Sequence, residues 1–84
     1  MKENPSPIDA SILLKLVEVR MPFGKFEGRL LADLPIFYLE WFSRKGFPAG
    51  ALGKQLATVY EIKLNGLDEI LHKVKAIEVQ RRGK

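Results

Sequence analysis

The sequence predicts an α+β fold, with an N-terminal helix, a short β-hairpin and then three helices packed as one small domain. Apolar residues recur at helical spacing in four segments, and a glycine-rich segment at residues 21–31 separates the first from the second. A length of 84 residues fits one domain. We expect this domain to span residues 1–84, with flexible tails at 1–5 and 80–84 and a core over about residues 6–79.

The first helix is predicted to begin at Ser6, whose hydroxyl can cap the helix. Pro7 then occupies the first helical position, and Asp9 completes a capping box. The helix is expected to end near Arg20, because Pro22 disfavours helical geometry in the residue before it. Its apolar side carries Ile8, Ile12, Leu13, Leu16 and Val19.

The glycine-rich segment is predicted to form the hairpin, with residues 21–23 and 29–31 as paired strands. Gly24 and Gly28 stand at the two ends of the connecting turn, where a tight reversal requires positive φ. Such a turn also exposes backbone N–H groups, which can form a nest for an anion.

Three further helices are predicted from capping residues and periodicity. The second follows Asp33 as its cap and ends at Gly46. The third spans residues 51–64, and Asn65 is expected to cap a fourth over residues 67–79.

Composition limits the classes of function. The chain has no cysteine and a single histidine, so it has no thiolate or multi-histidine metal site, and we expect no cofactor. The N-terminus lacks the features of a signal peptide, and no segment approaches the roughly 18 apolar residues of a spanning helix. We therefore expect a cytoplasmic protein without a membrane partner. Its net charge of +4 permits an anionic partner.

Catalysis is not expected. Nucleophilic catalysis needs a base and an orienting group, and the hydroxyl residues have only His72 to serve as base. A surface Asp68–His72 pair, four residues apart on a helix, is the simpler interpretation of that histidine. The alternative, a metal-dependent nuclease, predicts that Glu27, Asp33 and Glu61 converge on one cleft.

Binding of DNA or RNA is the leading hypothesis. Residues 20–54 hold six cations, three anions and seven of the eight aromatic residues, the combination with which proteins hold phosphates and stack bases. Large aromatic residues are usually buried, so we expect Phe23, Tyr38, Trp41 and Phe42 in the core. Phe26 lies within the loop, where a buried and an exposed position are equally expected. The predicted nucleic-acid site comprises Gly24, Lys25, Phe26, Gly28, Arg29, Arg44, Lys45 and Lys54.

A protein-interaction module or small homodimer is the alternative from a different class. The fourth predicted helix has a wide apolar stripe, and so short a chain offers little to cover it. The stripe comprises Leu67, Ile70, Leu71, Val74 and Ile77.

The motifs MPFGKFEGR at 21–29, YLEW at 38–41, KGFP at 45–48 and YEIKLNGL at 60–67 resemble the DUF3820 family of short bacterial proteins. That family is also described as quorum-sensing-regulated virulence factors. The resemblance covers residues 19–71 and implies a link to regulated expression. Phe26 stands where the family has tyrosine, and Glu27 stands where it commonly has lysine.

A related signature is similar to the C-terminal module of some DnaQ-like exonucleases, which implies an accessory contact to nucleic acid by analogy. The positions that match the shared motif are Phe23, Gly24, Lys25, Phe26, Gly28, Arg29, Tyr38, Leu39 and Trp41.

Overall fold

The computed structural model describes residues 10–82, which form a helical fold. The predicted α+β class is wrong, because this part of the chain contains no strand, only one isolated antiparallel bridge between Arg20 and Leu30. The predicted helix start at Ser6, Pro7 and Asp9 lies outside the described residues. The elements are α1 (Ala10–Leu16), a 3-10 helix η1 (Leu31–Asp33), α2 (Ile36–Lys45), α3 (Gly50–Leu64) and α4 (Asp68–Arg82).

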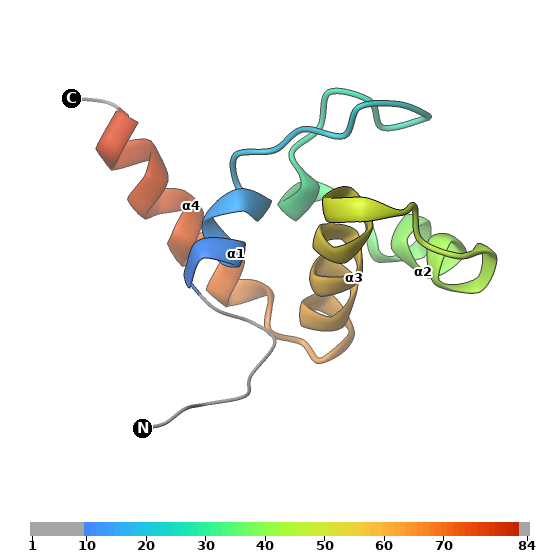
Figure 1. The fold of residues 1–84 in the computed structure, drawn as a ribbon. Helices are drawn as coiled ribbons and strands as arrows, with labels where there is room; N and C mark the ends of the chain where they lie inside the picture. Colours follow the sequence, from blue (N-terminus) through green and yellow to red (C-terminus); the bar gives the residue numbers. More distant parts are fainter. Residues whose placement is uncertain (1–9, 83–84) are drawn as a thin grey trace, which may run out of the picture.

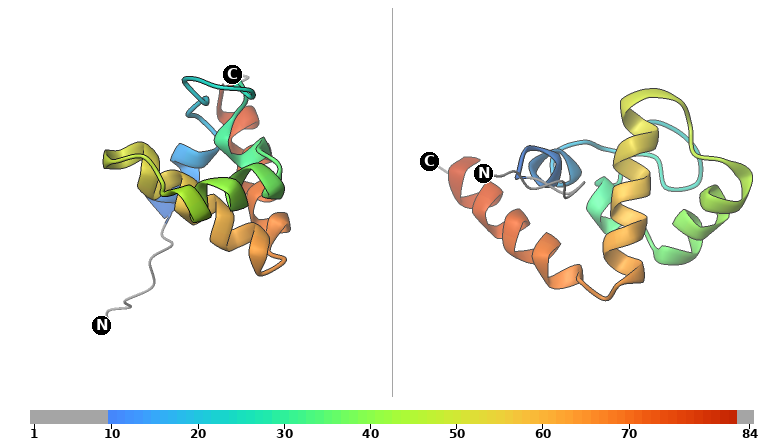
Figure 2. Two further views of the ribbon diagram at one scale, coloured as in Figure 1. Left: turned by 90° about the vertical axis from the view of Figure 1, so that its right-hand side faces the viewer. Right: turned by 60° about the horizontal axis from the view of Figure 1, so that its bottom comes forward.

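The four helices are arranged in the spatial order α4, α1, α3, α2, which differs from their order in the chain (Figure 1). α1 packs against both α4 and α3, and α3 packs against α2 and η1. The right-hand view in Figure 2 shows the same row, with α2 and α4 at its two ends. None of the helices within residues 10–82 is long and apolar enough to cross a membrane.

The core lies where α1, η1, α2 and α3 converge. Each fully buried leucine contributes about 1.5–3 kcal/mol relative to an exposed one, so this small set supplies most of the stability. The buried apolar residues are Leu16, Val17, Met21, Leu31, Ala32, Leu34, Leu39, Phe42, Leu56, Val59, Ile62 and Leu71.

The segment after α1 reverses direction as predicted, but it forms no hairpin of strands. The Met21 N–H donates to the Arg29 carbonyl at 2.7 Å, and the Leu31 N–H donates to the Val19 carbonyl at 3.0 Å. This short pairing cannot extend, because Pro22 lacks an N–H on one side and Leu31 enters η1 on the other. The same pairing draws the chain out of α1 at Leu16, earlier than the predicted end near Arg20.

The ends of α2 were predicted in part. Gly46 caps the C-terminus as expected, with φ of 109° and its N–H bonded to the Phe42 carbonyl. The N-cap is Pro35 and not Asp33. Asp33 instead accepts hydrogen bonds from the Lys75 ammonium at 2.8 and 2.9 Å, which joins η1 to α4. Both side chains are 40% exposed, so this ion pair contributes about 1 kcal/mol or less.

The turn between α3 and α4 uses Asn65 differently from the prediction. Its side-chain amide donates to the Glu61 carbonyl at 2.8 Å, so Asn65 caps the end of α3 and not the start of α4. Gly66 follows with φ of 70°, and the Leu67 N–H returns to the Ile62 carbonyl. At the other end, α4 continues to Arg82, past the predicted end of the fourth helix at residue 79.

Candidate functional site

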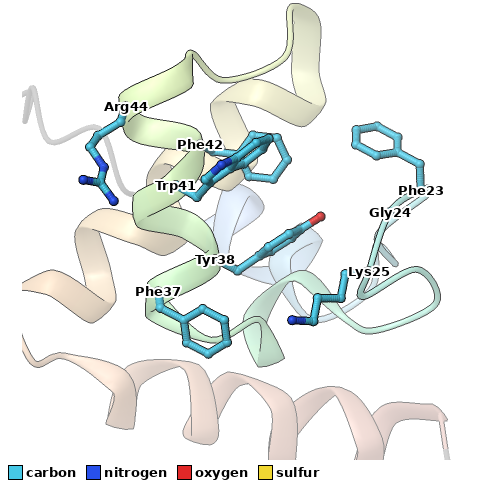
Figure 3. Close-up of a pocket in the computed structure, with 8 residues that line it drawn as sticks. All are labelled: Phe23, Gly24, Lys25, Phe37, Tyr38, Trp41, Phe42 and Arg44. Atoms are coloured by element: carbon cyan, nitrogen blue, oxygen red, sulfur yellow. The ribbon is translucent and has the colours of Figure 1, made fainter.

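An open aromatic cleft lies between α2 and the glycine loop, by which we mean residues 21–29. Its volume is about 540 Å³. Phe37 and Trp41 stand four residues apart on the outer side of α2 and are 60% and 48% exposed. Phe23 faces them from the glycine loop (Figure 3). The cleft is lined by Phe23, Gly24, Lys25, Phe37, Tyr38, Trp41, Phe42 and Arg44.

A second layer of rings supports the exposed ones. Tyr38 and Phe42 are also four residues apart, and their rings meet edge to face at 5.1 Å between centroids. Phe42 contacts Trp41 in the same manner at 5.1 Å, and Tyr38 contacts Phe26 at 4.8 Å. Edge-to-face pairs are worth about 0.5–1.5 kcal/mol beyond their burial, so the floor of the cleft is fixed before anything binds.

Gly24 lets the glycine loop approach α2 closely. Its φ is +83°, which only glycine adopts without strain, and a Cβ there would lie 2.8 Å from the Tyr38 hydroxyl oxygen. In Figure 3 that hydroxyl points toward the loop. The contact therefore sets the width of the cleft.

We expect Gly24→Ala to lower the free energy of unfolding by about 2–3 kcal/mol, of which about 1–2 kcal/mol comes from the left-handed backbone and the rest from the new contact. In a Tyr38→Phe background the cost should be smaller, because the hydroxyl that the methyl group meets is gone. Urea denaturation of the four proteins in this cycle measures the difference. Equal costs in both backgrounds would mean that loop and helix do not touch here.

Two cations border the cleft, Lys25 on the glycine loop and Arg44 on α2. The Lys25 ammonium lies 5.7 Å from the centroid of the Phe26 ring, and the Arg29 guanidinium carbon lies 5.3 Å from it. Phe26 is thus half-buried, with cations on it and Tyr38 against it. Arg20 donates to the Gly28 carbonyl at 2.7 Å, which secures the far end of the loop.

The structure brings together only part of the predicted nucleic-acid site. Gly24, Lys25 and Arg44 line the cleft. Lys45 and Lys54 are exposed but are not among its lining residues. Phe26, Gly28 and Arg29 shape and brace the loop from behind.

Sequence reasoning missed the walls of the cleft. Phe23 and Trp41 were expected in the core but are exposed, and Phe37 was not singled out, whereas Phe42 is buried as predicted. A signal was present in the sequence. Together with Leu39, the aromatic pairs 37/41 and 38/42 span about 200° around one helix, which is wider than the face of about 100° that a core usually covers.

The predicted interaction stripe on α4 is divided between two environments. Leu71 is buried and Val74 packs against the core, whereas Leu67, Ile70 and Ile77 are exposed. Within residues 10–82, no three acidic or histidine side chains gather as a metal site, so the convergence of Glu27, Asp33 and Glu61 that the nuclease alternative requires is not found.

Residues 9–74 match the family described as "putative quorum-sensing-regulated virulence factor". The uncharacterized protein YpeB of Escherichia coli K12 is 45% identical over 64 residues, which are 75% of this chain and 89% of the relative. The uncharacterized protein YpeB of Escherichia coli O157:H7 matches to the same extent. No solved structure matches the chain.

Proposed function

This chain belongs to the family of putative quorum-sensing-regulated virulence factors, and we propose that it is a non-enzymatic accessory module whose aromatic cleft binds single-stranded nucleic acid. The observation that carries this proposal is the pair of exposed rings on α2, Phe37 and Trp41, with a cation on either side of the cleft.

Exposed rings suit bases because every base offers a flat face for stacking. Each base stacked on an aromatic side chain is worth about 1–3 kcal/mol. Phe37 and Trp41 are spaced by one helical turn, and the layer of Tyr38 and Phe42 beneath keeps Trp41 in place. The rings lose little freedom on binding, which lowers the cost of association.

The charges suit a phosphate backbone. Lys25 and Arg44 come from different elements and border the same cleft, so a strand whose bases stack on the rings can bring phosphates to both. Arg20 is bonded to the Gly28 carbonyl, and neither Arg20 nor Arg29 lines the cleft, whereas Lys25 and Arg44 do. We therefore assign the contacts with phosphates to Lys25 and Arg44.

A single strand fits this cleft better than a duplex. Paired bases bury their faces and present hydrogen-bonding edges, which recognition helices read with polar side chains. The outer side of α2 presents rings instead. Aromatic and cationic side chains stack on bases and contact phosphates, so we propose a binding module and not an enzyme. We place it in the cytoplasm, where single-stranded nucleic acid is present and where proteins fold without disulfides, as this cysteine-free chain must.

Trp41 is the only tryptophan in the chain and lies in the cleft, so the protein carries its own probe. We expect a short oligothymidylate to quench its fluorescence, and rising salt to weaken the binding. By fluorescence polarisation of a labelled oligonucleotide, Trp41→Ala and Phe37→Ala should each weaken binding about tenfold or more. Lys25→Ala/Arg44→Ala should reduce the slope of log affinity against log salt by about 1.4, or 0.7 per phosphate.

Lys54→Ala is the matched control, since it removes an exposed cation that does not line the cleft. The affinity of this variant should stay within about twofold of the wild type, because a cation outside the cleft makes no direct contact with a phosphate bound there. The proposal is wrong if no oligonucleotide binds at low salt, or if Lys54→Ala weakens binding as much as Trp41→Ala does.

A further inference from the structure

Part of the glycine loop has backbone donors that the loop itself does not use. Four of its N–H groups are bonded to carbonyls within the loop, those of Met21, Glu27, Gly28 and Arg29. By contrast, the N–H groups of residues 23–26 donate to no group within residues 10–82. Successive N–H groups of this kind in a turn form a nest, a concave site that binds an anion. Two residues of this stretch, Gly24 and Lys25, also line the aromatic cleft.

The Tyr38 hydroxyl adds a donor from α2. The ring of Tyr38 is half-buried against Phe26 and Phe42, and its hydroxyl points toward the loop (Figure 3). This hydroxyl makes no hydrogen bond within residues 10–82. A Cβ at residue 24 would lie 2.8 Å from the hydroxyl oxygen and cover it, whereas Gly24 leaves it open to a ligand.

The distance between these donors suits an oxygen of a phosphate group. Because the hydroxyl oxygen lies 2.8 Å from the position of that Cβ, bond lengths place it within about 5 Å of the Gly24 nitrogen. O–H···O and N–H···O bonds span about 2.7 and 2.9 Å. One acceptor oxygen can therefore accept from the hydroxyl and from the Gly24 N–H at the same time.

The charges around these donors favour an anion. The Lys25 side chain belongs to the same stretch and lines the cleft, and no acidic residue lines it. Glu27, which is the one acidic residue of the glycine loop, is not among the lining residues. Backbone N–H groups, a hydroxyl and an ammonium are the donors with which proteins bind phosphate.

We propose that residues 23–26 and the Tyr38 hydroxyl form a phosphate-binding site on the loop side of the aromatic cleft. The site holds a backbone phosphate of the strand whose bases stack on Phe37 and Trp41. The choice of a strand rests on the proposed function, whereas the site itself requires only a phosphate group. Tyr38 then has two roles, since its ring supports the floor of the cleft and its hydroxyl positions the phosphate.

NMR spectra of the ¹⁵N-labelled full chain test the site with three probes. They are inorganic phosphate, an oligothymidylate, and a thymine peptide nucleic acid, which carries the same bases on a neutral backbone without phosphate. We expect the first two to move amide protons of residues 23–26 downfield, relative to chloride at the same ionic strength, because these protons bond to a charged oxygen. The peptide nucleic acid should move the Trp41 indole signal and leave those amides in place.

Tyr38→Phe tests the hydroxyl, because the substitution keeps the ring. We expect it to weaken binding of the oligothymidylate about tenfold or more, as the loss of a hydrogen bond to a charged group does. Its affinity for the peptide nucleic acid should stay within about twofold of the wild type. Tyr60→Phe is the matched control, since it removes the hydroxyl of the other tyrosine in the chain, which does not line the cleft.

The outcomes separate this site from the proposed function. An oligothymidylate that quenches Trp41 without moving the amides of residues 23–26 would overturn the site and leave the proposed function standing. Amides that respond to inorganic phosphate in a protein that binds no oligonucleotide would support the site and contradict the proposed function. The site would also be overturned if Tyr38→Phe bound the oligothymidylate as tightly as Tyr60→Phe, or if the peptide nucleic acid moved the same amides equally.

Discussion

Gly53→Ala is expected to destabilise the protein by about 3 kcal/mol or more, although alanine is the better helix former by roughly 1 kcal/mol. Gly53 lies in the first turn of α3 and is buried. A Cβ built there would overlap the Pro48 carbonyl oxygen and lie 2.9 Å from the Pro48 carbonyl carbon. Backbone atoms cannot rotate away as a side chain can. The segment at Phe47 and Pro48 must therefore move off α3.

Urea denaturation followed by circular dichroism measures this loss. Gly28→Ala is the control, because its φ is +90° but open space surrounds the position of its Cβ. The control should lose only the cost of a left-handed backbone, about 1–2 kcal/mol. A Gly53→Ala protein as stable as the wild type would mean that the Pro48 carbonyl does not rest on the helix.

Leu39→Ala is expected to cost about 2–5 kcal/mol, the range for leucine truncations in a packed core. Leu39 is fully buried on the inner side of α2, where that helix packs against α3. The cavity left by the truncation would loosen the helix that carries Phe37 and Trp41.

Ile36→Ala in the same helix is the control, since Ile36 is exposed. Its loss should stay below about 1 kcal/mol, so the denaturation midpoints of the two variants should separate clearly. Similar midpoints would mean that α2 is held by its exposed side and not by its contact with α3.

The sequence predicted the helices best where the signal was local. α3 was expected over residues 51–64 and spans Gly50–Leu64, because its periodicity is long and an Asn-Gly pair ends it. The capping of α2 by Gly46 follows from its positive φ, which glycine adopts without strain. At such positions, a residue and its immediate neighbours in the sequence determine the backbone conformation.

The errors arose where distant contacts decide. The glycines at residues 24 and 28 predicted a hairpin, and the chain does reverse there. Pro22 and η1 nevertheless limit the backbone pairing to a single bridge. Trp41 was placed in the core by its size, whereas the small core accepts Phe42 and leaves Trp41 outside. Which of two adjacent aromatic faces turns inward depends on where α3 packs, and periodicity within α2 does not contain that information.

The different order of the helices in the chain and in space has a consequence for synthesis on the ribosome. α1 emerges first, yet it packs between α3 and α4, and α4 emerges last. Until then the side of α1 that meets α4 has no cover, while α2 and α3 are consecutive and can dock as soon as both are made. The N-terminal part of the nascent chain therefore depends longest on protection from premature contacts, and the domain closes only when its final helix arrives.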